Sequence, residues 1–192
     1  MVQPFLKWAG GKRWLVQNHS DLFPNKFNRY IEPFLGSAAV FFHLQPNEAI
    51  LSDANGRLIE TYQSIKENYK LVEKYLRQHQ RAHSNEHYYE TRAKLFHSKF
   101  TRAAQFIYLN RTCWNGLYRE NKKGIFNVPI GTKTNVLLRT DDFAAVSNIL
   151  NNATLKNQDF EKTISLAEEG DFIFVDPPYT VAHNNNGFVK YN

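Results

Sequence analysis

Hydrophobic and polar positions alternate in blocks along the chain, and these blocks predict a sheet with helices between its strands. Four short apolar runs are typical of buried strands, namely Tyr30–Phe34, Ala49–Asp53, Ala153–Asp159 and Phe172–Val175. The clearest helical pattern repeats apolar side chains every three or four residues from Leu58 to Leu76. Because strands and helices alternate along the chain, we expect an α/β fold with a parallel sheet.

A long stretch separates the second predicted strand from the third. Its length of about a hundred residues is roughly three times that of an ordinary crossover between parallel strands. Two further helical patterns, about Tyr88 to Phe96 and Ala103 to Leu109, are followed by a loop-like segment rich in Gly and Asn from Asn110 to Asn135. We therefore predict one domain made of residues 1–55 and 136–192, with a second domain inserted at residues 56–135.

The composition is that of a globular protein. Of the 192 residues, 42% are hydrophobic, and no apolar run is long enough to span a membrane. The amino terminus, Met1–Phe5, lacks the charged and apolar regions of a signal peptide, so we expect a cytoplasmic protein. The single cysteine, Cys113, excludes an internal disulfide and argues against a cysteine-based metal site. We predict no metal centre.

Positive charge is concentrated in one part of the chain. From Lys99 to Arg139 there are eight basic residues and one acid, so this segment carries +7, more than the +6 of the whole chain. A solvated basic face is the usual explanation of such clustering. Here, however, aromatic and amide side chains lie among the cations, a combination suited to base recognition: Trp114, Asn115, Tyr118, Asn121 and Asn127. Nucleic acid is therefore the leading candidate partner.

The most informative motif is Asp176-Pro177-Pro178-Tyr179, directly after the fourth predicted strand. Open α/β sheets bind their ligands at the carboxyl ends of strands. Asp176 and the Pro177 carbonyl, held rigid by two prolines, can accept hydrogen bonds from an exocyclic amine while Tyr179 stacks on the ring that carries it. A Pro-Pro turn that only ends a strand is the structural alternative, and the rest of the chain must decide between the two.

The other predicted strands also end in side chains suited to a nucleoside. Glu32 to Ser37 follows the first strand but does not match the Gly-x-Gly-x-x-Gly dinucleotide pattern. Asp53 ends the second strand, where Rossmann-like sheets place an acid that receives ribose hydroxyls. Asp159-Phe160 ends the third and offers an acceptor for an adenine amino group and a ring to cover it. Acids at three strand ends predict a nucleoside pocket.

Near the front of the chain, Gly10-Gly11-Lys12 precedes an amphipathic helical pattern. The upstream glycine of a phosphate loop is missing and Arg13 stands in the Ser/Thr place, so we reject a nucleoside-triphosphate site. The two glycines still let the backbone approach a ligand closely, and Lys12 is suited to hold a carboxylate.

Together, these motifs resemble the DNA adenine N6-methyltransferases that methylate GATC-type sites. Phe5 to Lys12, Glu32 to Gly36, Asp53 and Asp176 to Tyr179 follow the order of that family, and Asn110 to Arg119 with Phe126 to Pro129 is similar to its target-recognition segment. The resemblance implies a Rossmann-like S-adenosylmethionine-dependent sheet, with an inserted recognition domain that binds double-stranded DNA. It also implies methyl transfer to N6 of an extruded adenine. We expect a monomer, and two roles stay open: a methylase with a cognate restriction endonuclease as its genetic partner, or a solitary regulatory or phage methylase.

By this resemblance and the strand-end argument we assign roles to individual residues. Lys7 and Arg119 match guanine-reading residues; Trp114, Asn115 and Leu117 match residues around the displaced adenine; Phe188 and Tyr191 match an aromatic pair after the catalytic loop. The predicted catalytic residues are Asp176, Pro177, Pro178 and Tyr179. The predicted cofactor-binding residues are Trp8, Gly10, Gly11, Lys12, Glu32, Pro33, Phe34, Gly36, Ser37, Asp53, Asp159, Phe160 and Asp176. The predicted DNA-binding residues are Lys7, Arg111, Trp114, Asn115, Leu117, Tyr118, Arg119, Lys122, Lys123 and Pro129.

Several alternatives stay open at this point. Family members continue beyond the position of Asn192, so we expect a fragment or a truncated gene product, with carboxyl-terminal strands missing from its sheet. A catalytically silent fragment that binds DNA or cofactor is therefore the main rival. An N4-cytosine, RNA or protein-amide methyltransferase would use related chemistry. A cytosine-C5 enzyme is excluded, because Cys113 lies far from any strand-end loop.

Overall fold

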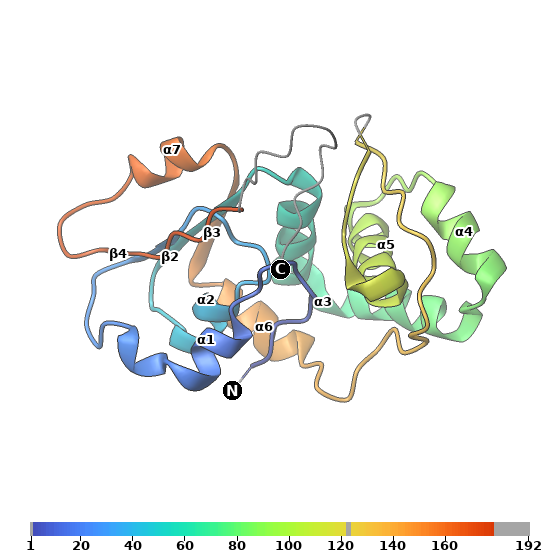
Figure 1. The fold of residues 1–192 in the computed structure, drawn as a ribbon, viewed down its shortest axis with the longest axis horizontal. Coiled ribbons are helices and arrows are strands. Elements are labelled where there is room, and N and C mark those ends of the chain that lie inside the picture. The colour runs from blue at the N-terminus through green and yellow to red at the C-terminus, as the bar shows by residue number, and fades with distance from the viewer. Residues whose placement is uncertain (1, 122–123, 179–192) are drawn as a thin grey trace, which may run out of the picture.

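The computed structural model describes residues 2–121 and 124–178, and within them the predicted α/β fold is confirmed (Figure 1). Four parallel strands form one sheet in the order β3-β2-β1-β4. Their bounds are Tyr30–Glu32 for β1, Ala49–Asp53 for β2, Ala153–Asn157 for β3 and Phe172–Ile173 for β4. All four predicted strands are present, and three of them end earlier than the apolar runs suggested.

The strand order explains why these runs are so apolar. β1 and β2 occupy the two inner positions of the sheet, and all of β1 and most of β2 are buried, as expected for parallel strands covered on both faces. The chain moves outward from β1 to β2 to β3 and then returns to place β4 on the other side of β1. The carboxyl ends of β1 and β4 therefore flank a point where the strand order reverses, which is where open α/β sheets bind ligands.

The described part of the chain also contains seven α-helices and two short 3-10 helices. Their bounds are α1 Arg13–Asn18, η1 Ser20–Leu22, α2 Ala39–Leu44, α3 Gly56–Ala82, α4 Asn85–Ala93, α5 Lys99–Thr112, η2 Trp114–Gly116, α6 Phe143–Leu150 and α7 Phe160–Ile164. The three helical patterns expected between the second and third strands correspond to α3, α4 and α5. In Figure 1 the sheet lies at left, α4 and α5 lie at right, and α3 stands between them.

The long helix α3 connects the sheet to the other helices. It begins after Asn55, whose side chain accepts a hydrogen bond from the Leu58 amide at 3.0 Å, and it kinks at Asn68. Before the kink, the Lys66 ammonium donates to the Ala153 carbonyl of β3 at 2.7 Å; after it, the Gln80 side-chain amide donates to the Thr134 carbonyl of the inserted segment at 3.1 Å. Because α3 contacts both the sheet and the inserted segment, the predicted domain boundaries at residues 55 and 136 stay a prediction.

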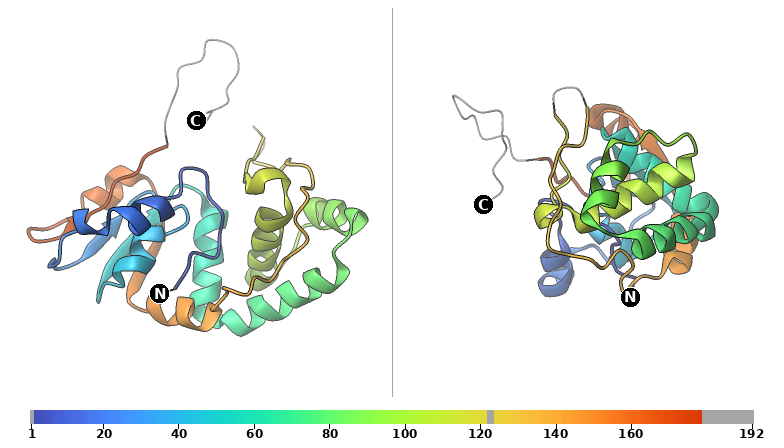
Figure 2. Two further views of the ribbon diagram at one scale, coloured as in Figure 1. Left: turned by 60° about the horizontal axis from the view of Figure 1, so that its bottom comes forward. Right: turned by 90° about the vertical axis from the view of Figure 1, so that its right-hand side faces the viewer.

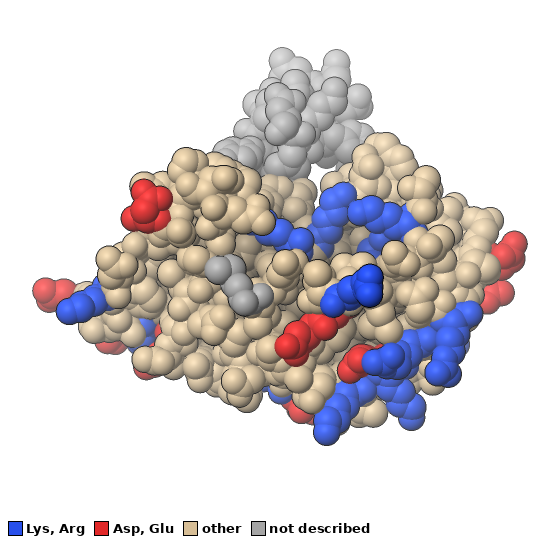
Figure 3. All heavy atoms as spheres, turned by 90° about the horizontal axis from the view of Figure 1, so that it is seen from below, with Lys and Arg blue, Asp and Glu red and all other residues tan. Residues whose placement is uncertain are grey.

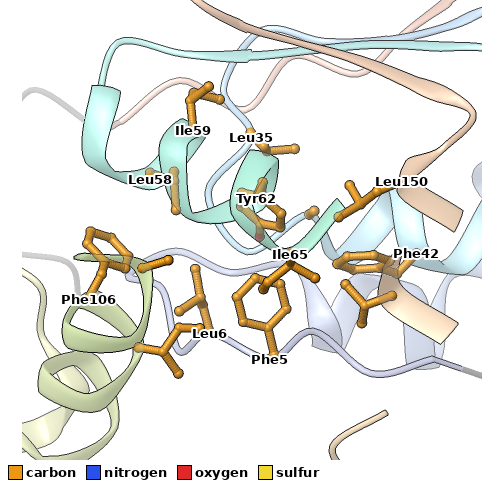
Figure 4. Close-up of a cluster of buried hydrophobic side chains, with 14 of the residues drawn as sticks. Phe5, Leu6, Leu35, Phe42, Leu58, Ile59, Tyr62, Ile65, Phe106 and Leu150 are labelled. Atoms are coloured by element: carbon orange, nitrogen blue, oxygen red, sulfur yellow. The ribbon is translucent and has the colours of Figure 1, made fainter. Parts of the chain in front are cut away.

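The amino-terminal segment, residues 5–12, runs between the sheet and α5 (Figures 1 and 2). Figure 4 shows its apolar start: Phe5 lies beside Tyr62 and Ile65 of α3, and Leu6 lies near Phe106 of α5. The Phe5 and Tyr62 rings meet edge to face at 5.1 Å between centroids. This packing places the residues that follow, including the two glycines, beside the carboxyl ends of the strands.

No helix in the described part of the chain is long and apolar enough to cross a bilayer.

Candidate active site

A pocket of about 210 Å³ opens at the carboxyl ends of the strands. Its walls come from the amino-terminal segment, the turns after β1 and β2, the start of α7 and the residues after β4. Every residue predicted to bind the cofactor lines it, together with Pro177 and Pro178 of the predicted catalytic motif. Segments far apart in the sequence thus converge as the strand-end argument expected, whereas the role of each residue is not tested by this convergence.

Asp176 follows β4 and lines the pocket, where its carboxylate forms an ion pair with Lys12. The Lys12 Nζ to Asp176 Oδ2 distance is 2.5 Å, and the same ammonium donates to the Gly10 carbonyl at 2.8 Å. Both side chains are partly buried, with 15% and 23% of their surface exposed. The contact fixes the carboxylate relative to the glycine turn. Tyr179, the last residue of the predicted motif, lies outside the described residues.

Asp53 at the end of β2 is held by two backbone donors. Its oxygens accept from the Gly36 amide at 3.2 Å and from the Asn55 amide at 2.9 Å. Burial raises the pKa of the Asp53 carboxyl, and these two hydrogen bonds oppose that shift. Because a carboxylate has about four acceptor sites, this arrangement orients Asp53 and leaves acceptor capacity for ligand hydroxyls.

Glu32 at the end of β1 differs from the other acids because it is 3% exposed. The Tyr30 hydroxyl donates to its carboxylate at 3.0 Å. Burial raises the pKa of Glu32 well above its ordinary value, the Tyr30 hydrogen bond lowers it, and the negative charges of Asp176 and Asp53 raise it further. Glu32 is therefore buried and has a raised pKa, whereas Asp53 and Asp176 in the same pocket are more accessible. The sequence did not indicate this difference in burial.

An aromatic pair closes the β3 side of the pocket. Phe34 and Phe160 stack at 5.2 Å between centroids with an interplanar angle of 27°. Asp159 caps α7, and its side chain accepts from the Glu161 amide at 2.9 Å. Phe174 also lines the pocket and was not predicted. It lies two residues before Asp176, and in an extended chain this spacing places both side chains on the same side, which is how the sequence could have indicated it.

The Gly36 turn and Trp8 contact each other across the pocket. Gly36 has a φ of +47°, and a Cβ atom built on it would lie 2.8 Å from the Trp8 ring. A side chain at this position would therefore displace the indole, so both the backbone conformation and the close approach require glycine. Gly11 likewise faces the Trp8 carbonyl, to which its amide donates at 3.1 Å.

The predicted DNA-binding residues occupy varied positions. Trp114, Asn115 and Pro129 are exposed, and Leu117 and Arg119 are partly buried; the Arg119 Nε donates to Asn127 at 3.3 Å. The Lys7 ammonium donates to the Asn115 carbonyl. Lys122 and Lys123, and the aromatic pair Phe188 and Tyr191, lie outside the described residues. Exposure leaves Trp114 and Asn115 available to a large ligand.

Arg111, which the sequence predicts to bind DNA, has a buried side chain. Its guanidinium forms a two-bond ion pair with Asp141 at 2.6 and 2.7 Å, and it donates to the Phe5 and Val136 carbonyls. Only 4% of the Arg111 side chain is exposed. These bonds join α5 to the amino-terminal segment and to Asp141, so the structure favours a structural role for Arg111, and its contact with DNA stays a prediction.

The charge of the basic segment is also less available than the sequence suggested. Lys99 pairs with Glu67, and Arg102 pairs with Glu60 at 2.5 Å. Another group of cations, which we did not single out from the sequence, lies on the exposed face of α3 and lines a shallow groove: Lys70, Lys74, Arg77 and Arg81. Figure 3 shows Lys and Arg gathered on the side where this part of α3 lies, and again near the upper middle of that view.

A second pocket, of about 710 Å³, adjoins the first and shares Trp8, Gly11 and Ser37 with it. Its walls include the cations Lys7, Arg13, Arg111 and Lys133 and, among the residues described, no Asp or Glu. This pocket could not be predicted from the sequence, because residues 132–135 meet the amino-terminal segment only in the folded chain. Among the described residues, no group of three or more His, Cys, Asp or Glu side chains could hold a metal ion.

Comparison with known proteins gives consistent matches along the chain. Residues 8–192 match the family model of the D12 class N6 adenine-specific DNA methyltransferases. The chain is 38% identical to the type II methyltransferase M1.LlaDCHI of Lactococcus lactis subsp. cremoris, over 99% of this chain and 70% of that protein. It is 36% identical to the DNA adenine methylase of Haemophilus influenzae, over 98% and 68% of the two chains. It is 31% identical to the DNA adenine methylase of Escherichia coli K12, over 98% and 69%.

Proposed function

The chain belongs to the family of D12 class N6 adenine-specific DNA methyltransferases, and we propose that it uses S-adenosylmethionine to methylate adenine N6 in a GATC-like duplex site. The family is enzymatic and its substrate is DNA. The observation that carries the proposal is the convergence of Asp176, Asp53 and the glycine turns in one pocket at the strand ends. The GATC-like target, the monomeric state, the cytoplasmic location and the restriction partner stay predictions.

The chemistry of the pocket fits the proposed cofactor. Asp53 offers oriented acceptors for ribose hydroxyls, and Phe34 and Phe160 offer apolar faces beside an acceptor on Asp159 for an adenine ring. Lys12 provides a positive charge for the carboxylate of an amino acid. S-adenosylmethionine would supply an electrophilic methyl group on a sulfonium. We assign Trp8, Lys12, Asp53 and Asp176 to its binding.

The amine of adenine is a poor nucleophile, because its lone pair is delocalised into the ring. We propose that Asp176 and the Pro177 carbonyl accept hydrogen bonds from N6, which favours a pyramidal nitrogen and stabilises the charge that develops on it. Positioning the amine against the methyl group contributes on the order of 7–11 kcal/mol in well-oriented systems. No covalent enzyme intermediate is required, so Asp176 acts by orientation and electrostatics.

Adenine N6 is reached in a duplex only when the base leaves the stack, which costs a few kcal/mol. We assign Tyr179 to stacking on the displaced base, and Trp114, Asn115 and Leu117 to the space around it. Lys7 and Arg119 are assigned to guanines of the site, and residues 56–135 to the inserted recognition domain. The exposure of Trp114 and Asn115 supports this assignment.

Calorimetry and a methyl-transfer assay test the proposal together. The protein should bind S-adenosylmethionine, and Asp53→Ala should weaken binding about tenfold or more, because a hydrogen bond to a charged group contributes about 1.5–3 kcal/mol. Asp21→Ala, which removes an exposed acid of η1, is the control. Equal affinity of Asp53→Ala and the unaltered protein would remove Asp53 from the site. Methyl incorporation into cytosine, or into RNA alone, would overturn the assigned substrate.

A further inference from the structure

The amino-terminal segment that lines the cofactor pocket is anchored to the recognition side of the molecule. The Lys7 amide donates to the Asn110 side chain at 3.0 Å, and the same side chain donates to the Lys7 carbonyl at 2.7 Å. Asn110 lies at the end of α5 and is completely buried. Its amide group can make this reciprocal pair only if the two segments keep their relative position. The backbone leading into Trp8 is therefore fixed from α5.

The indole of Trp8 is held by rings from the same side. Tyr118 stacks on it with a centroid separation of 5.8 Å and an interplanar angle of 18°, and Phe106 of α5 does so at 6.2 Å and 23°. The Gly36 turn, from the sheet side, also contacts this ring. Trp8 lines both pockets, so its orientation shapes each of them.

Tyr118 was predicted to contact DNA, but its ring is packed against other protein groups. It lies 4.3 Å from Phe106 and 5.1 Å from Phe126, measured between ring centroids, and its hydroxyl donates to Glu120 at 2.7 Å. It lines neither pocket. Its contact with a residue of the cofactor pocket is the stack on Trp8.

We propose that Tyr118 is a positioning residue for the cofactor site: its ring holds the Trp8 indole in place as a pocket wall. The recognition segment is then required for full cofactor affinity even when no DNA is bound. This inference rests on the proposed function, because only there is Trp8 a cofactor-contacting residue. An unsupported indole has other rotamers available, and cofactor binding must then select one of them, which lowers affinity.

The test is the affinity for S-adenosylmethionine, measured by calorimetry in the absence of DNA. Tyr118→Leu should bind about three- to tenfold more weakly, the range expected for loss of one aromatic pair. Tyr118→Phe keeps the ring, loses only the hydroxyl bond to Glu120, and should bind like the unaltered protein. Tyr89→Leu, which removes a partly exposed tyrosine that pairs with Tyr88 away from Trp8, is the matched control and should also be unchanged.

Two outcomes would overturn the inference. If Tyr118→Leu binds cofactor normally while Trp8→Leu binds it weakly, the stack does not position the indole, and the proposed function is untouched. If Trp8→Leu itself binds normally, the cofactor assignment of Trp8 is wrong and the inference falls with it. Thermal unfolding accompanies each measurement. If Tyr118→Leu does not fold, Tyr118→Met, which fills the space without a ring, replaces it with the same expected weakening.

Discussion

The strand-end pocket and the recognition segment, residues 110–135, differ in how their side chains are directed. Every residue predicted to bind the cofactor lines the pocket. In the recognition segment, Trp114 and Asn115 face solvent, whereas Arg111 and Tyr118 turn inward and support the fold. The parallel sheet forces the ends of its strands together. The described residues of the segment form no strand: they comprise the end of α5, η2, and loops joined by isolated bridges between residues 113 and 130 and between residues 120 and 126. A side chain's direction there depends on its individual packing.

The largest expected effect belongs to the pocket. Asp176→Ala should lower the methyl-transfer rate by at least a hundred- to a thousandfold, because it removes a group that stabilises developing charge. Duplex binding should change no more than a few-fold, since the carboxylate does not face phosphate. Methyl incorporation and duplex affinity are measured side by side, with Glu169→Ala as an exposed-acid control. Unchanged turnover by Asp176→Ala would remove the catalytic assignment and with it the contrast between the two regions.

The second effect separates structural from DNA-contacting residues in the recognition segment. Arg111→Ala leaves Asp141 buried without its partner, so we expect a loss of about 3–5 kcal/mol in the free energy of unfolding. Urea unfolding measures this loss. Arg119→Ala, which removes a partly buried arginine nearby, should change the free energy of unfolding by much less. A stable Arg111→Ala protein that has lost only DNA affinity would restore the original prediction for Arg111.

Arg119 provides the third test. An arginine that pairs with guanine O6 and N7 contributes about 1–3 kcal/mol of discrimination. Arg119→Ala should therefore relax selectivity at one guanine of a GATC-like site by roughly ten- to a hundredfold on that scale, with cofactor affinity unchanged. Methylation rates on GATC duplexes and on duplexes altered at the outer guanine measure this. A uniform decrease over all duplexes would indicate a phosphate contact instead.

The smallest effect concerns the helices beside the recognition segment. Burial, with the nearby charges of His87 and Lys94, lowers the pKa of His79 from 6.5 to about 4. The unfolded chain then binds more protons than the folded one between these values, so stability should fall as the pH drops from about 6.5 toward 4. The loss at pH 5 is on the order of 1–2 kcal/mol. Unfolding measured across this pH range should show the slope, and His79→Leu should flatten it. A His19→Leu control, at an exposed position, should retain it.

The sequence by itself determined the strands, the main helices and most of the residues around the pocket. Each of these follows from local periodicity together with one topological fact, that parallel strands bring their carboxyl ends to the same edge of the sheet. Asp53 and Asp176 were therefore placed correctly although they lie far apart along the chain.

Only the tertiary structure decided whether several polar and aromatic side chains are buried in the protein or exposed to solvent. Glu32 and Asp53 each end a strand, yet only Glu32 is fully buried, where the Tyr30 hydroxyl donates to it. From the sequence, Arg111 is one cation of a basic segment. In the structure, Asp141, thirty residues later in the chain, forms a buried ion pair with it. Local sequence reports the chemistry of a side chain. Burial and pairing depend on long-range packing, and here that packing made Arg111 and Tyr118 parts of the scaffold.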